Sequence, residues 1–327
     1  MNGPLLVTGA TGFVGGELVR ILLERGEEVH ALARGAHPDL PVTWHAADLC
    51  DARAVHAAVA AARPRRVVHC GALISYASRD TARARETNVE GTRHVLEACK
   101  RQGVARLCFV SSVVAVGPSP DGRPLDERSA FHGASLGVDY MDTKRAAEEL
   151  VLAAAGELDV VVANPAAVYG PAEGRSNTVK FLQQLAAGKR PLAVPPGTIA
   201  LVGVRDTAEG ILLVLERGRR GERYLLVERC VPVRELFRMM GAALGVPSVQ
   251  RTIPRALWPL VVAAARAVDC VRPLEIATPQ GLAMIGSQLV FDGRKAREEL
   301  GWRPQPFEDV LRETIAVLRA RGVLPPG

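Results

Sequence analysis

The stretch VTGATGFVG, residues 7–15, decides the fold of this chain. It follows a short apolar run, Leu5–Val7, and leads directly into an amphipathic stretch, Glu17–Arg25. Glycines three residues apart let a main chain turn sharply from a strand into a helix and lie against a pyrophosphate, whose charge meets the free N–H groups of the helix start. The glycines at this spacing are Gly9, Gly12 and Gly15. The sequence therefore predicts a dinucleotide-binding turn, with a plain strand-to-helix turn as the alternative.

Apolar runs and helix-like segments alternate through the first half of the chain. The runs that predict strands are Leu5–Val7, Glu28–Ala33, Val42–Trp44, Val67–His69, Leu107–Val110 and Val160–Ala163. The segments between them that predict helices include Arg53–Ala62, Ala84–Arg101 and Tyr140–Ala155. Several strand runs are apolar throughout, as strands covered by helices on both faces require. The prediction is an α/β fold with a Rossmann-type, doubly wound parallel sheet.

The pattern loosens after Pro165, which indicates a domain boundary. Residues 1–165 are predicted to form a dinucleotide-binding domain and residues 166–327 a smaller, mostly C-terminal substrate-binding region, with segments near 199–229 returning to the main sheet. The later part is predicted to hold a loop at Tyr169–Ser176, strands at Ile199–Val204 and Arg223–Val227, and helices at Thr178–Gly188 and near 207–217, 232–243, 255–269 and 305–321. A chain of 327 residues, 48% of them hydrophobic, has ample core for this arrangement.

Composition excludes several other classes of protein. No apolar run reaches membrane-spanning length, since the longest, Ala256–Ala265, contains a proline and ends at Arg266. The 41 basic and 35 acidic residues are interleaved and aromatic residues make up only 4%, so no nucleic-acid partner is expected. The six cysteines have no CxxC spacing, which indicates reduced thiols, and no metal site is predicted. Because the chain begins almost directly with a strand and shows no signal segment, we expect a cytoplasmic protein.

The end of the second predicted strand distinguishes between dinucleotides. In NAD-binding proteins an acidic side chain stands there and accepts hydrogen bonds from the adenosine ribose. This chain has Leu32-Ala33-Arg34 instead, and the guanidinium of Arg34 could hold a ribose 2′-phosphate with two hydrogen bonds. NADP is therefore favoured, the alternative being that Arg34 simply lies in solvent. Asp48 and Leu49 follow the third strand and could contact the adenine; a helix N-cap role for Asp48 or Asp51 is the alternative.

A tyrosine and a lysine stand four residues apart at the start of a predicted helix, so both side chains lie on one face. They are Tyr140 and Lys144, in a chain with 36 arginines and 5 lysines. A lysine ammonium can bind ribose hydroxyls while its charge favours a tyrosinate, which an isolated tyrosine, with a pKa of about 10, does not form near neutral pH. The alternative is a helix-face tyrosine beside an unrelated surface lysine.

A serine pair, Ser111-Ser112, ends the predicted strand Leu107–Val110 at the sheet edge where open α/β folds bind ligands. A hydroxyl there can donate to a substrate carbonyl oxygen and polarise it. Serines at strand ends are, however, usually just turn formers. No Gly-x-Ser-x-Gly segment surrounds either serine, which excludes the usual arrangement of a serine hydrolase.

Seven segments match one family in order along essentially the whole chain. They are Thr8–Gly15, His69–Ala72, Asn88–Thr92, Ser111-Ser112, Tyr140-x-x-x-Lys144, Asn164–Pro171 and Glu298–Pro304. Each is a weak signal alone, but together they resemble an extended short-chain dehydrogenase/reductase, a member of the NAD-dependent epimerase/dehydratase superfamily.

The resemblance implies a catalytic triad of Ser112, Tyr140 and Lys144, in which Tyr140 passes a proton to the substrate oxygen. The resemblance also implies three sets of cofactor contacts. The pyrophosphate would be bound by Gly9, Thr11, Gly12, Phe13, Val14 and Gly15, and the adenine by Asp48 and Leu49. The remaining part of the dinucleotide would be contacted by Gly71, Ala72, Asn88, Ala163, Pro165 and Val168, together with Tyr140 and Lys144. Asn164 joins Ser112 and Tyr140 as a candidate substrate contact.

One segment departs from the family members that act on nucleotide sugars. Those members usually carry an Arg-Asp pair followed by an aromatic residue, Ile and His-Val-x-Asp, whereas this chain reads IALVGVRD at residues 199–206. A sugar-nucleotide pyrophosphate would therefore lack a basic partner there, although another arginine could supply one. The resemblance is closer to the branch that contains dihydroflavonol reductase and the 3β-hydroxysteroid dehydrogenases.

These observations predict an NADPH-dependent reductase of a ketone or aldehyde on a largely apolar small molecule, or the reverse alcohol oxidation. A nucleotide-sugar epimerase or dehydratase is the first alternative, and a dinucleotide-binding sensor without turnover is the second. The apolar segment Ile253–Val271 is either a lid over the substrate or a helix packed on its own domain. Helices Ala84–Arg101 and Tyr140–Ala155 could pair two copies into a homodimer, and no membrane partner is expected.

Overall fold

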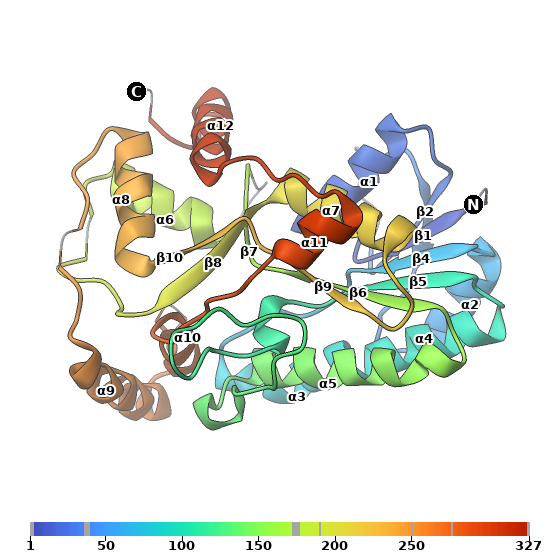
Figure 1. Ribbon diagram of the computed structural model, residues 1–327, viewed down its shortest axis with the longest axis horizontal. Helices are drawn as coiled ribbons and strands as arrows, with labels where there is room; N and C mark the ends of the chain where they lie inside the picture. The colour runs from blue at the N-terminus through green and yellow to red at the C-terminus, as the bar shows by residue number, and fades with distance from the viewer. Residues whose placement is uncertain are drawn as a thin grey trace.

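A seven-stranded parallel sheet forms the centre of the molecule (Figure 1). The computed structural model describes residues 3–35, 40–171, 177–189, 191–249, 251–275 and 277–325. In spatial order the strands are β3 (Thr43–Ala46), β2 (Val29–Ala33), β1 (Leu5–Thr8), β4 (Arg66–His69), β5 (Arg106–Val110), β6 (Val160–Pro165) and β9 (Arg223–Leu226). The chain switches direction across the sheet between β1 and β4, and open α/β sheets bind ligands in the crevice at such a point.

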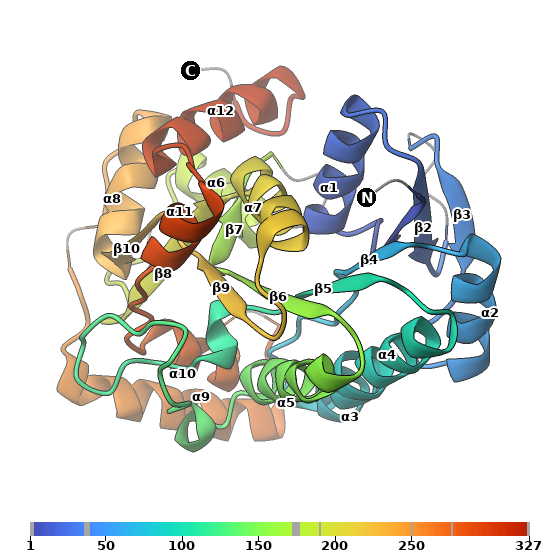
Figure 2. The same cartoon turned by 45° about the vertical axis from the view of Figure 1, so that its right-hand side comes forward.

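Helices cover both faces of this sheet (Figure 2). On one face lie α1 (Phe13–Glu24), α7 (Val204–Arg217) and α11 (Arg294–Leu300), and on the other α2 (Ala52–Ala62), α4 (Gly91–Arg101) and α5 (Asp139–Ala153). Side chains alternate between two apolar cores: in β5, Cys108 packs on the first face and Leu107 and Phe109 on the second. Burial on both faces explains why the strands are apolar throughout. The predicted fold class is confirmed.

The helix predicted over Ala84–Arg101 is built from three pieces. α3 (Thr81–Arg85) leads into a π-helical turn, Glu86–Glu90, which continues into α4. Such turns insert one residue into a helix and re-aim its side chains, often at functional sites. Here the π-helical turn contains Asn88, whose side chain reaches the main chain of Leu73 after β4.

A smaller sheet of three strands forms the base of the second region. β8 (Thr198–Gly203) pairs in parallel with β7 (Ala167–Tyr169) and antiparallel with β10 (Arg229–Pro232). α6 (Asn177–Ala186), α8 (Val233–Leu244) and α12 (Phe307–Ala320) pack around it in a separate apolar cluster. Of the two strand segments expected near 199–229, β9 therefore joins the large sheet, whereas β8 joins the small one because β7 and β10 flank it. The domain division near residue 165 remains a proposal.

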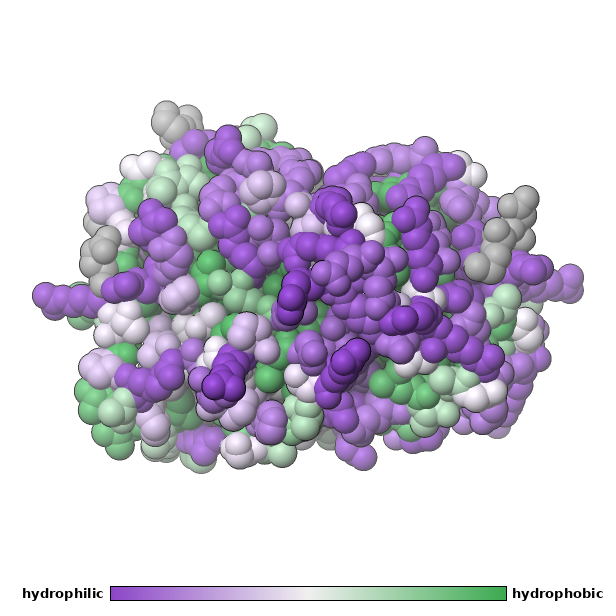
Figure 3. Space-filling view, viewed as in Figure 1, coloured by the Kyte–Doolittle hydropathy of each residue, from purple (hydrophilic) through white to green (hydrophobic). Residues whose placement is uncertain are grey.

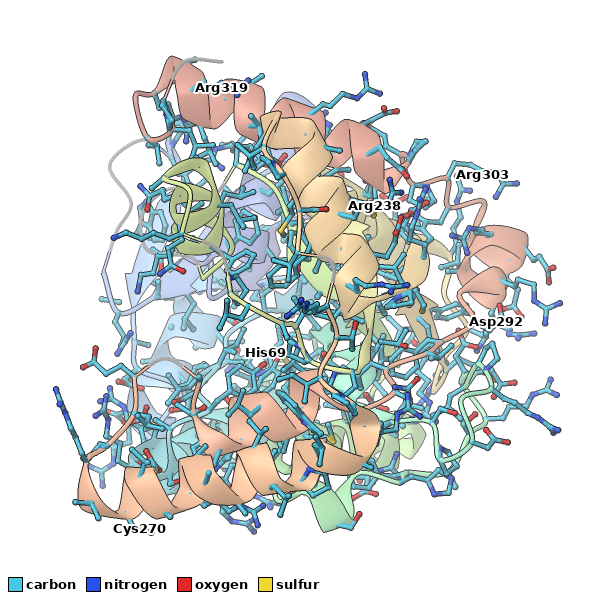
Figure 4. All side chains as sticks on the ribbon, turned by 90° about the vertical axis from the view of Figure 1, so that its left-hand side faces the viewer. His69, Arg238, Cys270, Asp292, Arg303 and Arg319 are labelled. Carbon is cyan, nitrogen blue, oxygen red and sulfur yellow. The ribbon has the colours of Figure 1, made fainter. Side chains whose placement is uncertain are left out.

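Two helices lie at the edge of the second region, and α10 (Pro279–Ile285), the second of them, contacts the start of α5. α9 (Trp258–Val271) packs against α10. Trp258 is the buried residue of α9, and its Nε1 donates to Leu282 O at 3.2 Å. Much of the rest of α9 is exposed and apolar, as the green area at the lower left of Figure 3 shows, and Cys270 lies at its outer end (Figure 4). The first turn of α9 is thus its main anchor.

Most helices and strands lie within a few residues of the positions that the sequence predicts, and the differences have local causes. Tyr169 ends strand β7 although the sequence predicts a loop from that residue, because a strand of three residues carries little signal in the sequence. Residues 172–176 of that loop lie outside the described ranges. β10, α10 and α11 were not predicted, since four to seven residues are too few to show a period.

Two absences hold for the described ranges. No helix in them has the length and apolar character needed to cross a bilayer. They also contain no group of three or more His, Cys, Asp or Glu side chains that could hold a metal ion.

Candidate functional site

The glycine turn between β1 and α1 is shaped by close main-chain contacts. Gly9 has a φ of +68°, and a Cβ there would lie 2.7 Å from the main chain of Gly71. A Cβ on Gly15 would lie 2.3 Å from the carbonyl oxygen of Gly9. Gly12 is the N-cap of α1, and no side chain caps that helix. The positive end of α1 is therefore open to an anion, as a dinucleotide pyrophosphate requires.

A cavity of about 600 Å³ opens beside this turn at the carboxyl ends of β1, β2 and β4. Eight of its lining residues are cofactor contacts predicted from the sequence: Gly9, Thr11, Gly12, Arg34, Asp48, Leu49, Gly71 and Ala72. The others are Leu32, Ala33, Ala47, Cys70, Leu73, Asp80, Arg83 and Thr87. Glycine main chain on one side and charged side chains at the rim fit the adenosine and pyrophosphate portions of a dinucleotide.

A buried histidine, His69, which is labelled in Figure 4, ends strand β4 and binds residues on both sides of it. His69 Nδ1 lies 2.6 Å from Thr8 Oγ1, and its Nε2 lies 3.1 Å from Thr92 Oγ1. Thr92 Oγ1 donates to Asn88 O, so it accepts from His69 Nε2, and Thr8 must then donate to Nδ1. Thr8 Oγ1 in turn accepts from Gly71 N at 3.2 Å. Burial lowers the pKa of His69 to about 3, so this neutral ring holds Gly71 in place.

Two arginines border the cavity. Arg34 follows β2 and is exposed, while Arg83 comes from α3; neither has an ion-pair partner among the described residues. Asp48 accepts from Cys50 N at 3.0 Å; that hydrogen bond, assisted by both arginines, holds the pKa of Asp48 below its usual range. Asp51, and not Asp48, is the N-cap of α2. Sequence analysis missed Arg83 because only the packing of α3 places it here.

Ser112 and Tyr140 meet at the carboxyl end of β5. Ser112 is half-buried, and its Oγ accepts from Val114 N at 3.4 Å at the start of a short 3-10 helix. Tyr140, the second residue of α5, is 8% exposed. Burial raises the pKa of Tyr140 to about 12, while a hydrogen bond with the Ser112 side chain opposes the rise. The phenol is therefore protonated near neutral pH.

Lys144 lies one turn further along α5 and is 2% exposed. Its Nζ donates to Val110 O at 2.7 Å and lies 4.5 Å from the centroid of the Phe109 ring. Burial lowers the pKa of Lys144 to about 8, and the charge of Glu148 acts in the opposite direction. The residues proposed as a triad thus gather at the end of one strand, with the ammonium bound to the main chain of that strand.

Other predicted residues lie behind the cavity or beside it. Asn88 Oδ1 accepts from Leu73 N at 2.7 Å, and its Nδ2 donates to Leu73 O and to Thr143 Oγ1. Asn164 is fully buried and donates to Ser112 O at 3.0 Å, and its contact with a substrate stays a prediction. The remaining predicted contacts are Phe13, Val14 and Gly15 in the first turn of α1 and Ala163, Pro165 and Val168 in β6 and β7.

An apolar cluster surrounds the ring of Tyr140. The Tyr76 ring packs edge-to-face on it, with the centroids 5.8 Å apart. The other members are Val114, Phe131, Leu136, Val138, Met141, Ala283 and Met284. The last two belong to α10, which Gln280 ties to the start of α5 by donating to Asp139 Oδ2 at 2.6 Å. The Tyr140 hydroxyl therefore lies next to an apolar region that sequence analysis did not assemble.

The doubly wound sheet, the glycine turn and the cavity beside it define a Rossmann-type protein that binds a dinucleotide. Residues 5–226 match the model of the NAD dependent epimerase/dehydratase family, and the chain belongs to this family. Members of the family bind a nicotinamide dinucleotide, and the chain is an oxidoreductase of the extended short-chain dehydrogenase/reductase type. The family predicted from the sequence is confirmed.

The chain is similar over nearly its whole length to several known proteins. Sterol demethylase protein B of Methylococcus capsulatus is 32% identical over 330 residues, which cover 98% of this chain and 99% of that protein. A putative dihydroflavonol 4-reductase of Synechocystis is 31% identical over 329 residues, covering 96% and 94%. The crystal structure of gox2253 has a TM-score of 0.85 and 31% identity, covering 99% of this chain and 100% of that chain.

Proposed function

We propose that this protein is an NADPH-dependent reductase of a ketone or aldehyde on a largely apolar small molecule, and that it can also run in reverse as an alcohol dehydrogenase. The observation that carries the proposal is the buried Tyr140 phenol inside an apolar cluster that includes Val114, next to the short helix that Ser112 caps, at the same sheet edge as the glycine turn. These two hydroxyl groups can bind and protonate a carbonyl oxygen without exposing it to water.

Each of the three residues has a distinct role in this proposal. Ser112 donates a hydrogen bond to the carbonyl oxygen, and Tyr140, which burial keeps protonated, gives that oxygen its proton. Lys144 holds the ribose next to the nicotinamide and stabilises the tyrosinate that remains. The nicotinamide, when bound, supplies the hydride.

The choice of NADPH rests on the rim of the cavity. No carboxylate follows β2 where an NAD-binding protein would have one, and the exposed guanidinium of Arg34 stands in that place. A guanidinium can bind a 2′-phosphate with two parallel hydrogen bonds, which a carboxylate at the same position would repel.

The apolar substrate rests on the surroundings of Tyr140 and on two relatives whose names refer to a sterol and to a dihydroflavonol. β8 lies where nucleotide-sugar enzymes carry their basic and histidine residues, and here it reads Thr-Ile-Ala-Leu-Val-Gly. Because α9 is anchored mainly by Trp258, we favour the lid over the packed helix for the segment Ile253–Val271.

A spectroscopic screen of NADPH oxidation over steroid, flavonoid, aryl aldehyde and β-keto ester panels tests the proposal, with NADH in parallel. In the Tyr140→Phe variant we expect turnover to fall by about 10²- to 10⁴-fold with little change in NADPH affinity, since the hydroxyl serves proton transfer. Full activity of Tyr140→Phe would exclude the mechanism.

The family match favours one second candidate, a nucleotide-sugar epimerase or dehydratase. Tight co-purification of NAD and saturable binding of a UDP- or GDP-sugar would support that function. A sensor that binds NADPH but turns over no carbonyl compound is the third possibility, and the same screen distinguishes it.

We further propose a cytoplasmic homodimer. The six free cysteines fit a reducing compartment. A groove of about 310 Å³ between the α3–α4 segment and α5, which contains Val89 and Leu150, offers a surface for pairing two copies. Light scattering after gel filtration measures the oligomeric state directly.

A further inference from the structure

A buried carboxylate lies directly behind the proposed triad and has no part in the mechanism above. Glu148 stands one helical turn beyond Lys144 on α5 and is 0% exposed. Its Oε2 accepts from Asn164 Nδ2 at 2.6 Å, and its Oε1 accepts from Arg223 Nη1 at 2.9 Å. A buried charge is costly unless it is paired and hydrogen-bonded, and both conditions are met here.

The two partners of Glu148 connect it to the rest of the site. The Asn164 amide also donates to Ser112 O at 3.0 Å, so one side chain links the carboxylate to the serine. Arg223 reaches in from β9, with its side chain 11% exposed, and also donates to Glu127 O at 2.7 Å and to Ser129 O at 3.2 Å. These contacts tie the segment before α5, strand β6 and strand β9 to one carboxylate.

We propose that Glu148, held by Arg223 and Asn164, is a positioning residue that keeps the ammonium of Lys144 charged and the Ser112 turn in place. This inference rests on the proposed reductase function, because only that function requires a charged Lys144 and a fixed position of Ser112. It adds Arg223, a residue from the C-terminal half of the chain, to the residues that support Ser112, Tyr140 and Lys144.

The charges near Lys144 explain why the carboxylate matters. Burial lowers the pKa of Lys144 and the charge of Glu148 raises it, and the net value of about 8 leaves the ammonium close to losing its proton at slightly alkaline pH. Three other titratable groups face it without charge near pH 7: burial lowers the pKa of His69 to about 3 and raises those of Cys70 and Tyr140 to about 12. Glu148 supplies the negative charge that favours the ammonium of Lys144, while Arg223 forms an ion pair with the Oε1 atom of the same carboxylate.

The direct test measures the titration of Lys144 in the folded protein. With ¹³Cε-lysine, the chain gives five lysine signals, and the one that is lost in Lys144→Met belongs to Lys144. In Glu148→Gln we expect the Lys144 midpoint to fall by about one pH unit or more below that of the wild type. The matched control is Glu149→Gln, which removes the same charge from the neighbouring residue, whose side chain is 57% exposed, and should leave the midpoint unchanged.

A folded Glu148→Gln protein in which Lys144 titrates as in the wild type overturns the proposal. If this variant does not fold, Glu148→Asp replaces it: the carboxylate is retained but drawn back, so a smaller fall is expected, and a wild-type midpoint again overturns the proposal. Neither measurement needs turnover, so a failure of the reductase function would be recognised separately.

Activity gives a second readout once a substrate is found. Because Lys144 must carry its proton, the ratio of kcat at pH 8.5 to kcat at pH 6.5 should fall about tenfold further in Glu148→Gln than in Glu149→Gln. A purely structural role of Glu148 would lower kcat equally at both pH values, and that result would also contradict the proposal.

Discussion

At the scale of single residues, the proposed preference for NADPH rests on Arg34 and Arg83. Both border the same cavity, and both assist in lowering the pKa of Asp48, so both positive charges lie close to the part of the cavity that contains Asp48. Neither is ion-paired within the described ranges, which leaves both guanidinium groups available to a ligand.

In Arg34→Ala we expect the KM for NADPH to rise about 10- to 100-fold while the KM for NADH stays unchanged, since hydrogen bonds to a charged group contribute about 1.5–3 kcal/mol. Arg83→Ala should show the same selectivity with a smaller effect. Steady-state kinetics with both cofactors measure this, with Arg312→Ala on α12 as the control. Equal losses for NADPH and NADH would assign both arginines to general stability instead.

His69 makes the stability of the protein depend on pH. Its pKa is lowered to about 3 in the folded state, so the unfolded chain binds more protons below pH 6.5. The contribution of the neutral ring is complete above pH 6.5 and is lost progressively as the pH falls towards 3, by on the order of 5 kcal/mol in total.

Urea unfolding at pH 7 and pH 4.5 should therefore show a clear loss of stability at the lower pH. Because Gln cannot gain a proton, His69→Gln should be less stable at pH 7 but should lose less on acidification than the wild type. An identical pH dependence in the two proteins would mean that other groups control it.

At the scale of elements, the first turn of α1 requires a glycine at position 15, because a side chain there would clash with the main chain. A Cβ on Gly15 meets Gly9 O at 2.3 Å, whereas a Cβ on Gly16 meets Ala10 O at an ordinary 3.5 Å. The two neighbours therefore form a matched pair of helical glycines with opposite expected outcomes.

Gly15→Ala should weaken NADPH binding strongly and lower Tm, since the turn must open to admit the methyl group. Gly16→Ala should leave binding intact and raise stability by up to about 1 kcal/mol, because alanine favours a helix interior. Cofactor fluorescence and thermal unfolding measure both effects. Similar results for the two variants would show that the turn tolerates more space than the contacts indicate.

The elements also show what the sequence can and cannot predict. β1 and β4–β6 are apolar runs buried on both faces, so pattern alone finds them. The glycine turn and the Tyr140–Lys144 pair are equally local signals. The contact of Glu148 with Arg223 joins residues 75 positions apart, and no period in the sequence encodes it. The motif that contains Asn164 is also a local signal, whereas the full burial of this side chain is a property of the packed sheet and no local pattern encodes it.

At the scale of the whole molecule, the proposed boundary near residue 165 divides the sequence but not the sheet. β9 lies beyond it and pairs with β6 from Val162–Arg223 to Pro165–Leu226. α7 also lies beyond it and supplies Ile211, Leu212 and Leu215 to the core beneath α1. A fragment of residues 1–165 would lack both.

We expect the fragment 1–165, expressed alone, to show no cooperative thermal transition and to aggregate, since β6 becomes a bare edge and one face of the sheet loses its cover. Co-expression with residues 166–327 should restore a soluble complex, which gel filtration detects. A lone fragment that unfolds cooperatively and binds NADPH would prove that it is an independent folding unit.

The late position of β9 has a consequence for synthesis in the cell. The ribosome must release nearly sixty further residues after β6 before the strand that borders it emerges. Throughout that interval the nascent chain presents an open hydrogen-bonding edge to its surroundings, and neighbouring nascent chains on the same messenger present the same edge. Slow elongation through this stretch would therefore favour pairing between chains, and chaperone capture of the unfinished sheet would protect against it.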